Sequence, residues 1–323
     1  MITIKTKEEV ELMRHAGKIA YKILNDLKKV IVPGMTTEEI DKYVYNVIVE
    51  NDSTPTFLNY DGFPASACIS LNEVVVHGIP NKSKVKNGDI ISVDIGVNYK
   101  GMNVDTAYTY ILGDVNKKIT NLVNETQRAL YEGIKVIKPG ISLNDVCSSI
   151  EKVAKTNKFG IIKQLTGHGV GKELHEDPYI PNYSNDESKE IILKEGMSLA
   201  IEPMFSLGTN KIYMDEDGWA IYTADYSKTA HFEHTVLVTK DGYEIITGEW
   251  YCLAKDGYIE ITGKVSEVLP GRSYKVKLEN GYEIEAYVSG KMRMYNINIC
   301  PGDTVLLEIP TCDLTRGRII RRK

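Results

Sequence analysis

Four carboxylates and one imidazole lie in apolar or glycine-rich stretches of this 323-residue sequence. Glu202 ends an apolar run just before Pro203, and His168 lies among three glycines in segment 166–171, where backbone can approach closely. The full set is Asp94, Asp105, His168, Glu202 and Glu233. Carboxylate oxygens with one ring nitrogen suit manganese, iron, cobalt or zinc, and two ions that share carboxylates can activate one water between them. The set therefore predicts a site for two divalent metal ions.

The segment around Asp94 and Asp105 gives a physical reason to expect these ions. Residues 91–97 and 102–106 read as a hairpin with its turn at 98–101. With Val97 opposite Met102, Asp94 is predicted to lie directly across from Asp105 on one face of the hairpin. Like charges placed opposite each other destabilise a sheet, and a pair of divalent cations removes the repulsion. The alternative is an exposed edge hairpin with two solvated acids, and each residue taken singly could be a satisfied polar group.

The elements that must position these residues occur twice in the sequence. Segments 30–40 and 136–146 share a Val-Ile-x-Pro-Gly pattern and a helix start, and each follows a helical pattern, 8–29 or 120–135. In the first copy Thr36 and Glu39 form a predicted capping box. Segments 88–94 and 196–202 then each end an apolar strand on a carboxylate. The order predicts an internal duplication of helix, helix and strands; the alternative is chance similarity of short runs.

The sequence changes character from about Tyr258, where short alternating strands replace helices. Strands are predicted at 258–265, 274–278, 282–288 and 304–308, with hairpin turns at Pro270-Gly271 and Asn280-Gly281. We therefore expect one domain over residues 1–250 and a small β-barrel over residues 254–323. Residues 1–253 hold 27 Lys+Arg against 35 Asp+Glu, and residues 254–323 hold 12 against 9. This asymmetry predicts that only the C-terminal part contacts nucleic acid.

Composition limits the compartment and the class of protein. Apolar residues make up 42% of the chain, which permits a full core without disulfides. No two of the five cysteines are spaced as in a CxxC zinc motif, and the N-terminus lacks the apolar core of a signal peptide. No apolar run approaches the roughly 18 residues of a membrane span. We expect a cytoplasmic protein with no membrane partner.

Several stretches of the first 248 residues resemble type I methionine aminopeptidases. They are segments 68–80, 166–171, 201–204 and 232–235, together with Asp94 and Asp105 at a spacing of eleven. The resemblance implies the α+β pita-bread fold, whose pseudo-two-fold symmetry agrees with the repeat. It also implies that Asp94 and Asp105 bind one ion and that Asp105, His168, Glu202 and Glu233 bind the other. Asp105 and Glu233 would bridge the two ions.

The resemblance further implies roles in catalysis and substrate binding. His77 would contact the substrate amide, His175 would hydrogen-bond the scissile carbonyl and its developing oxyanion, and Glu202 would also shuttle a proton. The methionine side chain would occupy a pocket of Phe57, Tyr60, Phe63, Cys68 and Trp219, where sulfur–aromatic contacts suit a thioether. These aromatic residues could instead simply fill the core, and Phe57 and Leu174 occupy positions that vary in the family.

Segments 259–265, 278–281, 288–293, 301–303 and 313–319 resemble bacterial translation initiation factor one, over residues 253–323. This resemblance implies a five-stranded OB-fold barrel that binds the small ribosomal subunit. Lys291, Arg293, Arg316 and Arg318 would contact rRNA phosphates, although such residues are also common as solvated surface. The sequence departs from the family at 294–298, which carries no basic residue where the factor usually has several.

Together these features predict a monomeric enzyme that removes N-terminal methionine from nascent polypeptides whose second residue is small. The C-terminal domain is predicted to bind the small ribosomal subunit during translation initiation. Two rivals remain. One is another pita-bread peptidase, such as an X-Pro enzyme, although such enzymes usually carry a large extra N-terminal domain. The other is a catalytically inactive, ribosome-associated binding protein, although its metal-ligand positions would then be broken.

Overall fold

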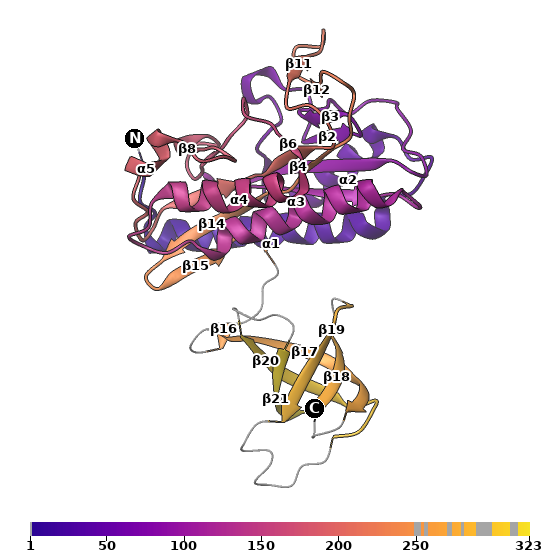
Figure 1. Cartoon of the computed structure of the whole chain (residues 1–323), viewed down its shortest axis with the longest axis vertical. Helices are drawn as coiled ribbons and strands as arrows, with labels where there is room; N and C mark the ends of the chain where they lie inside the picture. Colours follow the sequence, from indigo (N-terminus) through magenta and orange to yellow (C-terminus); the bar gives the residue numbers. More distant parts are fainter. Residues whose placement is uncertain are drawn as a thin grey trace. The chain divides into compact units, whose positions relative to one another are not determined.

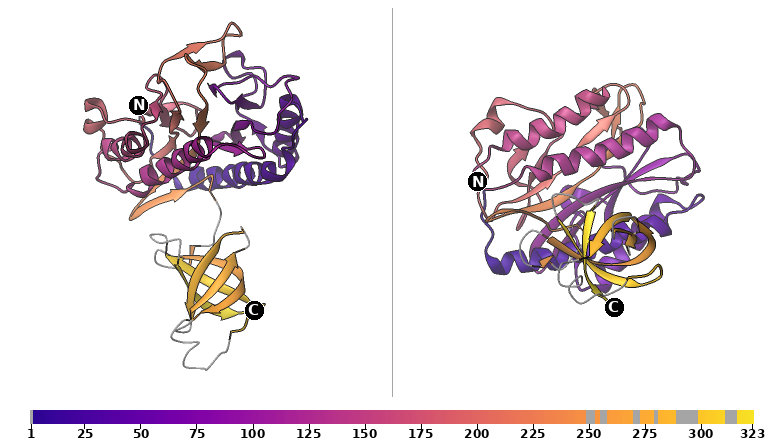
Figure 2. Two further views of the ribbon diagram at one scale, coloured as in Figure 1. Left: turned by 45° about the vertical axis from the view of Figure 1, so that its right-hand side comes forward. Right: turned by 60° about the horizontal axis from the view of Figure 1, so that its bottom comes forward.

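The computed structural model describes residues 2–248, 253–254, 258–269, 273–278, 281–288, 299–310 and 316–323. For residues 253–254, 258–259, 310 and 316 it describes the backbone alone. The chain forms two compact units, Met1–Glu249 and Trp250–Lys323. Figures 1 and 2 show helices and strands packed together in the first unit and strands in the second.

Four long helices cover the strands of the first unit (Figure 1). They are α1 (Lys7–Val30), α2 (Thr37–Glu50), α3 (Lys117–Lys135) and α4 (Leu143–Asn157), and a short α5 spans Asp186–Glu190. The predicted capping box is confirmed. The Glu39 backbone amide donates a hydrogen bond to the Thr36 hydroxyl, and the Thr36 backbone amide donates one to the Glu39 carboxylate. Among the described residues, no helix is long and apolar enough to cross a membrane.

Two sheets in the first unit carry the candidate metal ligands. In one, β4 (Ile90–Tyr99) pairs with β1 (Thr54–Pro55), β2 (Ala67–Leu71) and β5 (Met102–Ile111). The other has the order β15 (Gly242–Ile245), β14 (His234–Thr239), β9 (Ser198–Ile201), β7 (Gly167–Gly169) and β8 (Glu176–Ile180). Two smaller sheets flank them. One runs β13 (Thr229–His231), β10 (Met204–Ser206), β6 (Gly160–Ile161), and the other runs β11 (Ile212–Met214), β12 (Ile221–Thr223), β3 (Val74–Val76).

The alternation along β4 separates the hydrophobic core from the candidate site. Ile91, Val93, Ile95 and Val97 pack in one core with residues of α1 and α2. Side chains alternate across a strand, so Ser92, Asp94 and Gly96 face the opposite way. A second core joins α3 and α4 to Leu199 and Ile201 of β9. Both candidate carboxylate strands are thus fixed from behind by helices.

Matching backbone hydrogen bonds show the duplication directly. The Gly34 amide donates to the Val85 carbonyl at 2.8 Å, and the Gly140 amide donates to the Leu193 carbonyl at 2.9 Å. Both glycines have positive φ, +96° and +90°, which glycine adopts readily. In each copy the residue at the helix start also forms an isolated bridge, Thr36 with Lys84 and Ser142 with Ile192. The repeat predicted from the sequence is therefore present as repeated structure.

The predicted register of the β4–β5 hairpin is wrong by two residues. Tyr99 pairs with Met102, so Asp94 lies opposite Ala107 and Asp105 lies opposite Gly96. The turn contains only Lys100 and Gly101, both with positive φ, +49° and +85°. A two-residue turn with two positive φ angles matches the twist of the strands, whereas the expected four-residue turn does not form. The observed register differs from the predicted one by two residues, which is one full period of side-chain alternation. Both aspartates therefore still lie on the same face of the hairpin, as diagonal neighbours.

The second unit is a closed barrel in its described residues. Its strands are β16 (Leu253–Ala254), β17 (Tyr258–Leu269), β18 (Ser273–Leu278), β19 (Glu283–Val288), β20 (Thr304–Pro310) and β21 (Arg316–Arg322). Their order is β16-β17-β18-β19-β21-β20, and pairing of β17 with β20 closes a five-stranded barrel. The four predicted strands are confirmed, and the turn before Tyr282 has Gly281 at φ +88°. The predicted turn at 270–271 lies outside the described residues.

Candidate metal centre and substrate pocket

The structure brings the five predicted ligands together from five different segments. Asp94 lies on β4, Asp105 on β5, His168 on β7, and Glu202 directly follows β9. Glu233 lies between β13 and β14, where its backbone exchanges hydrogen bonds with Ala107 of β5. Ligand atoms of Asp105, His168 and Glu233 lie within 4.8 Å of one another. His168 Nε2 is 3.7 Å from Asp105 Oδ2 and 3.8 Å from Glu202 Oε1.

The carboxylates of this cluster are buried close to one another. The exposed fraction is 4% for Asp105 and 2% for Glu233. Burial, together with the charge of Glu202, raises the pKa of Asp105 to about 8, and burial raises the pKa of Glu202 to about 8. Burial and the neighbouring carboxylates raise the pKa values of Asp94 and Glu233 well above their ordinary range. A buried cluster of acids with these pKa values is stable as anions only beside compensating positive charge.

Three oxygens in the cluster lack hydrogen-bond partners. They are Oδ1 of Asp94, Oδ1 of Asp105 and Oε1 of Glu233, all of them buried. A buried polar atom without a partner costs free energy, on the order of 1–3 kcal/mol. In proteins, carboxylate oxygens of this kind bind divalent cations. The residues present therefore fit a metal centre rather than an exposed acidic hairpin.

His168 has the hydrogen bond expected of a metal-binding imidazole. Its Nδ1 lies 2.8 Å from the Gly169 carbonyl, which can only accept, so Nδ1 carries the proton. Nε2 is then unprotonated and faces Asp105 and Glu202. Burial lowers the pKa of His168 to about 4, which keeps the ring neutral. A neutral imidazole oriented by a backbone carbonyl is the usual form of a metal ligand.

His231, which was not predicted as a site residue, also lies in this cluster. Its Nε2 is 3.2 Å from Glu202 Oε2 but does not form a hydrogen bond with it. Burial lowers the pKa of His231 to about 3, so this ring is neutral as well. Period-two spacing placed His231, Glu233 and Thr235 on one face of an extended segment, and that signal could have identified it. Thr235 supports the same site, because its hydroxyl donates to the Asp105 carbonyl at 2.8 Å.

The two histidines expected to contact substrate lie beside the cluster. His77 directly follows β3 with φ +59°, and burial together with His231 and His175 lowers its pKa to about 4. His175 lies just before β8, and its ring meets the His168 ring edge-on with centroids 4.4 Å apart. Its Nδ1 is 2.9 Å from the Tyr60 hydroxyl, which leaves Nε2 as the nitrogen without this contact.

All five residues of the predicted methionine pocket lie in one hydrophobic cluster. Phe57, Phe63 and Cys68 are buried there with Ala65 and Leu174, and Tyr60, Ile79 and Trp219 pack at its border. Phe63 and Trp219 meet edge-on with ring centroids 5.1 Å apart. Cys68 is the cross-strand partner of Asp94, so the cluster adjoins the carboxylates. Burial raises the pKa of the Cys68 thiol well above its ordinary value, so it is a neutral group.

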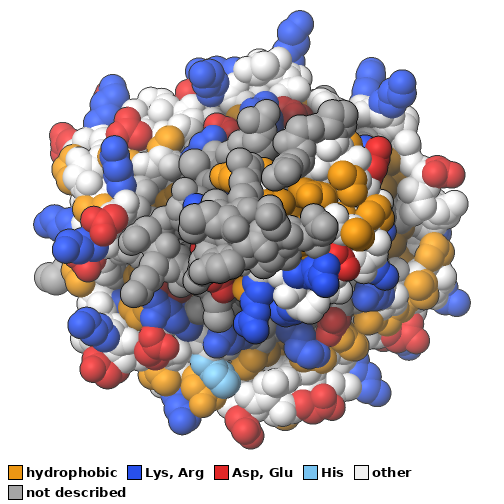
Figure 3. Space-filling model, turned by 90° about the horizontal axis from the view of Figure 1, so that it is seen from below, with side chains coloured by type: hydrophobic (Ala, Val, Ile, Leu, Met, Phe, Trp, Pro, Cys, Tyr) orange, Lys and Arg blue, Asp and Glu red, His pale blue; other side chains and the backbone are white. Residues whose placement is uncertain are grey.

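The residues expected to contact rRNA are only partly described. Lys291 and Arg293 lie outside the described residues, and for Arg316 the backbone alone is described, in β21. Arg318 donates from Nε to Glu308 at 2.9 Å, and Arg322 lies 3.6 Å from Asp303. Figure 3 draws side chains of both units, and on that face Lys and Arg are interspersed with Asp and Glu. The described part of the barrel therefore pairs several of its own cations.

Comparison with known proteins agrees with both parts of this picture. Residues 11–240 match the model of metallopeptidase family M24, and residues 252–323 match that of translation initiation factor 1A / IF-1. The chain is 43% identical over 248 residues to a methionine aminopeptidase of Mycoplasma capricolum, covering 76% of this chain and 98% of the relative. The solved methionine aminopeptidase of Thermotoga maritima is 46% identical with a TM-score of 0.75, covering 77% of this chain and all of that chain.

A prolidase is also similar, but less so. The solved prolidase of Pyrococcus furiosus is 26% identical with a TM-score of 0.62, covering 76% of this chain and 66% of its own. Both kinds of neighbour share the pita-bread fold, and the C-terminal barrel corresponds to an OB fold. The chain thus belongs to the methionine aminopeptidases of metallopeptidase family M24, and it carries a C-terminal barrel of the initiation-factor type.

Proposed function

We propose that this chain removes the N-terminal methionine from nascent polypeptides whose second residue is small, using two divalent metal ions. The observation that carries the proposal is the buried cluster of Asp94, Asp105, His168, Glu202 and Glu233, with three oxygens that lack partners. Asp94 and Asp105 would hold one ion. Asp105, His168, Glu202 and Glu233 would hold the other, with Asp105 and Glu233 shared. Cobalt, manganese, iron and zinc all fit this donor set.

The ions, when bound, supply a nucleophilic water at neutral pH and a Lewis acid for the scissile carbonyl. The chain's own residues bind and orient the substrate. If His175 Nδ1 accepts a hydrogen bond from the Tyr60 hydroxyl, the neutral ring carries its own proton on Nε2. That Nε2–H can donate to the scissile carbonyl oxygen, where negative charge develops in the transition state. His77, which is close enough to His231 and His175 for their charges to lower its pKa, would contact the substrate amide.

Proton transfer falls to Glu202 in this proposal. Its carboxylate lies among the other proposed ligands, with Oε1 3.8 Å from His168 Nε2, where it could accept and return a proton of the reacting water. The neutral ring of His231 lies beside this carboxylate, with its Nε2 3.2 Å from Glu202 Oε2. The methionine side chain would occupy the cluster of Phe57, Tyr60, Phe63, Cys68 and Trp219, where a thioether can contact aromatic rings.

Metal dependence is the first test of this function. Chelation followed by removal of the chelator should abolish methionine release from Met-Ala-Ser, because the carboxylates alone cannot activate water. Added cobalt or manganese should restore release, measured as free methionine over time. An X-Pro peptide incubated in parallel should remain intact. Full activity in protein shown by elemental analysis to be metal-free would contradict the two-metal site, and preferential cleavage of the X-Pro peptide would favour a prolidase activity.

We propose that the C-terminal barrel binds the small ribosomal subunit in the cytoplasm, and that the chain acts as a monomer. The support for ribosome binding is the match to the initiation-factor family together with the excess of positive charge over residues 254–323. Phosphate contacts by Arg316 and Arg318, together with Lys291 and Arg293, would supply a salt-dependent part of the affinity. In the structure Arg318 is paired with Glu308, so rRNA would have to compete with that carboxylate.

The attached acidic unit should weaken this binding. Residues 1–253 carry eight more acidic than basic residues, and rRNA phosphates repel such a unit. We therefore expect the full chain to bind small subunits more weakly than residues 254–323 alone, with a gap that widens at low salt as screening decreases. Binding would be measured by co-sedimentation across a salt series, with circular dichroism to verify that the fragment is folded. Equal affinity of the two proteins at every salt concentration would refute this expectation.

A further inference from the structure

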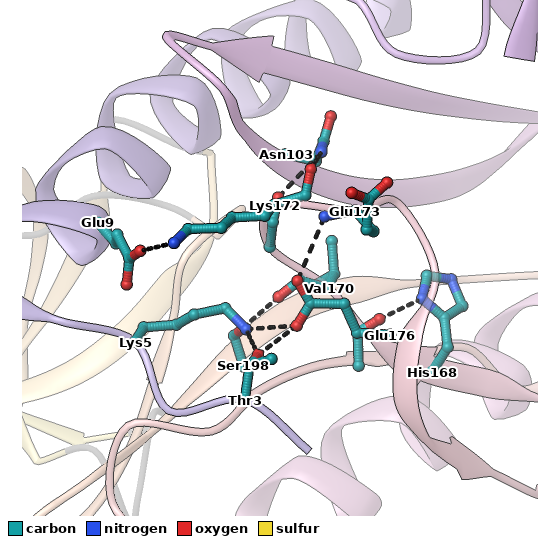
Figure 4. A network of polar contacts seen from close by, with 12 residues as sticks. Thr3, Lys5, Glu9, Asn103, His168, Val170, Lys172, Glu173, Glu176 and Ser198 are labelled. Carbon is teal, nitrogen blue, oxygen red and sulfur yellow. Dashed lines mark hydrogen bonds and ion pairs between the residues drawn. The ribbon is translucent and has the colours of Figure 1, made fainter. Parts of the chain in front are cut away.

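The loop that carries His175 is held from several sides by hydrogen bonds. Residues 170–175 connect β7 to β8, and His175 is the last residue of this loop. Asn103 Nδ2 donates to the carbonyls of Gly171 and Lys172, both at 2.9 Å. Figure 4 shows this loop between His168 on one side and Thr3, Lys5 and Glu9 of the N-terminal segment on the other. The position of His175 therefore depends on contacts with distant parts of the chain.

Two Lys–Glu pairs join the N-terminal segment to this region (Figure 4). Lys5 Nζ lies 2.6 Å from Glu176 Oε2, and the two side chains are 3% and 7% exposed. Lys172 Nζ lies 2.9 Å from Glu9 Oε1, but here the lysine side chain is 71% exposed and the glutamate 18%. Exposed pairs contribute little because water screens them, whereas breaking a buried pair leaves an uncompensated charge. The Lys5–Glu176 pair is therefore the one expected to fix structure.

Glu176 connects this pair to the loop. Its carboxylate accepts hydrogen bonds from the Thr3 hydroxyl and from the Glu173 amide as well as from Lys5. Burial opposes ionisation of Glu176, but the bonds from Lys5 and Thr3 hold its pKa below the ordinary value. Lys5 is itself fixed, because its amide donates to the Gly196 carbonyl at 2.8 Å. The residue after His175 is thus tied to a segment that is itself anchored elsewhere in the first unit.

His175 lies beside open space on this side. A cavity of about 500 Å³ is lined by His175 and by the four residues of the two ion pairs, Lys5, Glu176, Glu9 and Lys172. His175 is therefore not packed against other residues on every side. The Tyr60 hydroxyl contacts one ring nitrogen of His175, and the neighbouring Glu176 carboxylate accepts a hydrogen bond from the backbone amide of Glu173 in the same loop.

We propose that Lys5 is a positioning residue for His175, acting through its buried ion pair with Glu176. The pair sets where the imidazole lies relative to the scissile carbonyl. This inference rests on the proposed function, in which His175 hydrogen-bonds that carbonyl, and it adds a residue separated from Glu176 by 171 positions in the sequence. Because His175 would act on charge that develops during the reaction, loss of the pair should lower kcat rather than raise KM.

The test compares two lysine variants that each remove one of the Lys–Glu pairs. Lys5→Met should lower kcat for Met-Ala-Ser by roughly ten- to a hundred-fold, the range expected from a misplaced catalytic group, with little change in KM. Lys172→Met, the matched control, should change kcat by less than about two-fold, since its pair is exposed. Release of methionine by the unmodified chain in the same assay establishes the proposed function separately. If that chain is active and the two variants have equal kcat, the positioning role is excluded.

A double-mutant cycle distinguishes positioning from general loss of structure. If Lys5 acts through His175, then Lys5→Met should have almost no further effect in a His175→Ala background. Losses that multiply in the double variant would overturn the proposal. Thr3→Val removes one donor to Glu176 from an exposed position and should give a smaller loss that likewise disappears with His175→Ala. This second variant decides the matter if Lys5→Met does not fold.

Hydrogen exchange in the metal-free protein gives a readout independent of turnover. The amides of Gly171 and Glu173 are bonded within the loop and to Glu176. Lys5→Met should speed exchange in a peptide covering 170–177, and Lys172→Met should speed it much less. Unchanged exchange in Lys5→Met would show that the ion pair does not hold this loop.

Discussion

Asp105→Asn is expected to abolish methionine release, with kcat/KM falling by more than about 100-fold. Loss of a residue that only hydrogen-bonds to a metal ligand costs up to about 100-fold, and loss of a ligand itself should cost more. Asp105 is buried in the cluster, and its Oδ2 lies 3.7 Å from His168 Nε2. The neutral side-chain amide of asparagine could not supply the negative charge with which Asp105 would bind both ions. Metal content per chain should fall in elemental analysis of the purified variant. Asp114→Asn, which changes an exposed aspartate beyond the end of β5, is the matched control and should leave both quantities unchanged.

The same substitution should have opposite effects on the stability of the two forms. In the metal-free protein, Asp105→Asn removes one of several buried acidic groups, so its thermal midpoint should equal or exceed that of the unmodified chain. Added manganese should raise the midpoint of the unmodified chain, because the ion binds the folded state, and should raise that of the variant much less. A variant that keeps both its turnover and its metal-induced stabilisation would refute the bridging role of Asp105.

Met-Ala-Ser should be cleaved at least about 100-fold faster than Met-Lys-Ser, a discrimination that shape alone can supply when a pocket excludes a side chain. Leu174 is 4% exposed, packs in the methionine-pocket cluster and directly precedes His175. If the second substrate residue lies beside His175, a large side chain there would have to displace Leu174 or the imidazole. Rates of methionine release from the two peptides measure the discrimination directly.

Leu174→Ala tests the cause of this selectivity. A smaller side chain at 174 should narrow the difference between the two peptides by accelerating Met-Lys-Ser, while Met-Gly-Ser serves as the control for general loss of activity. Equal rates for Met-Ala-Ser and Met-Lys-Ser in the unmodified chain would show that the second position is not crowded. An unchanged ratio in Leu174→Ala would place the selectivity in other residues.

The helices and their starts could be predicted from the sequence because their signals are local. The Thr36–Glu39 box needs only residues three apart, and the Pro-Gly turns at 33–34 and 139–140 need only their own backbone. The duplication was equally visible, because two copies of one pattern specify the same hydrogen bonds. The candidate metal ligands could be identified in the same way, as carboxylates and an imidazole in apolar or glycine-rich stretches.

The register of the β4–β5 hairpin could not be predicted with the same certainty. The alternation of apolar and polar residues predicts which face of the strand each residue occupies. It cannot distinguish two pairing registers that differ by two residues, because both place every side chain on the same face. Turn length decided the shift, since Lys100 and Gly101 close the hairpin with two residues at positive φ. Asp94 and Asp105 are therefore diagonal rather than opposite, and both still contribute to the cluster.

Other features exist only once the chain is folded. A glycine in the middle of α1 counts against a helix by propensity, yet a Cβ at Gly17 would collide with the Ile246 carbonyl, so glycine permits the close packing there. His231 gains its neighbour Glu202 from another strand, and the Lys5–Glu176 pair joins residues 171 positions apart. Burial and repulsion between carboxylates raise the pKa values of the clustered acids, and residues from many segments contribute to both effects. The sequence by itself determined which groups could bind metal and which elements carry them, because these depend on residue type and short-range pattern. Only the tertiary structure decided the distances between these groups, their protonation and the contacts that hold His175. These properties depend on which distant segments of the chain pack together and exclude water.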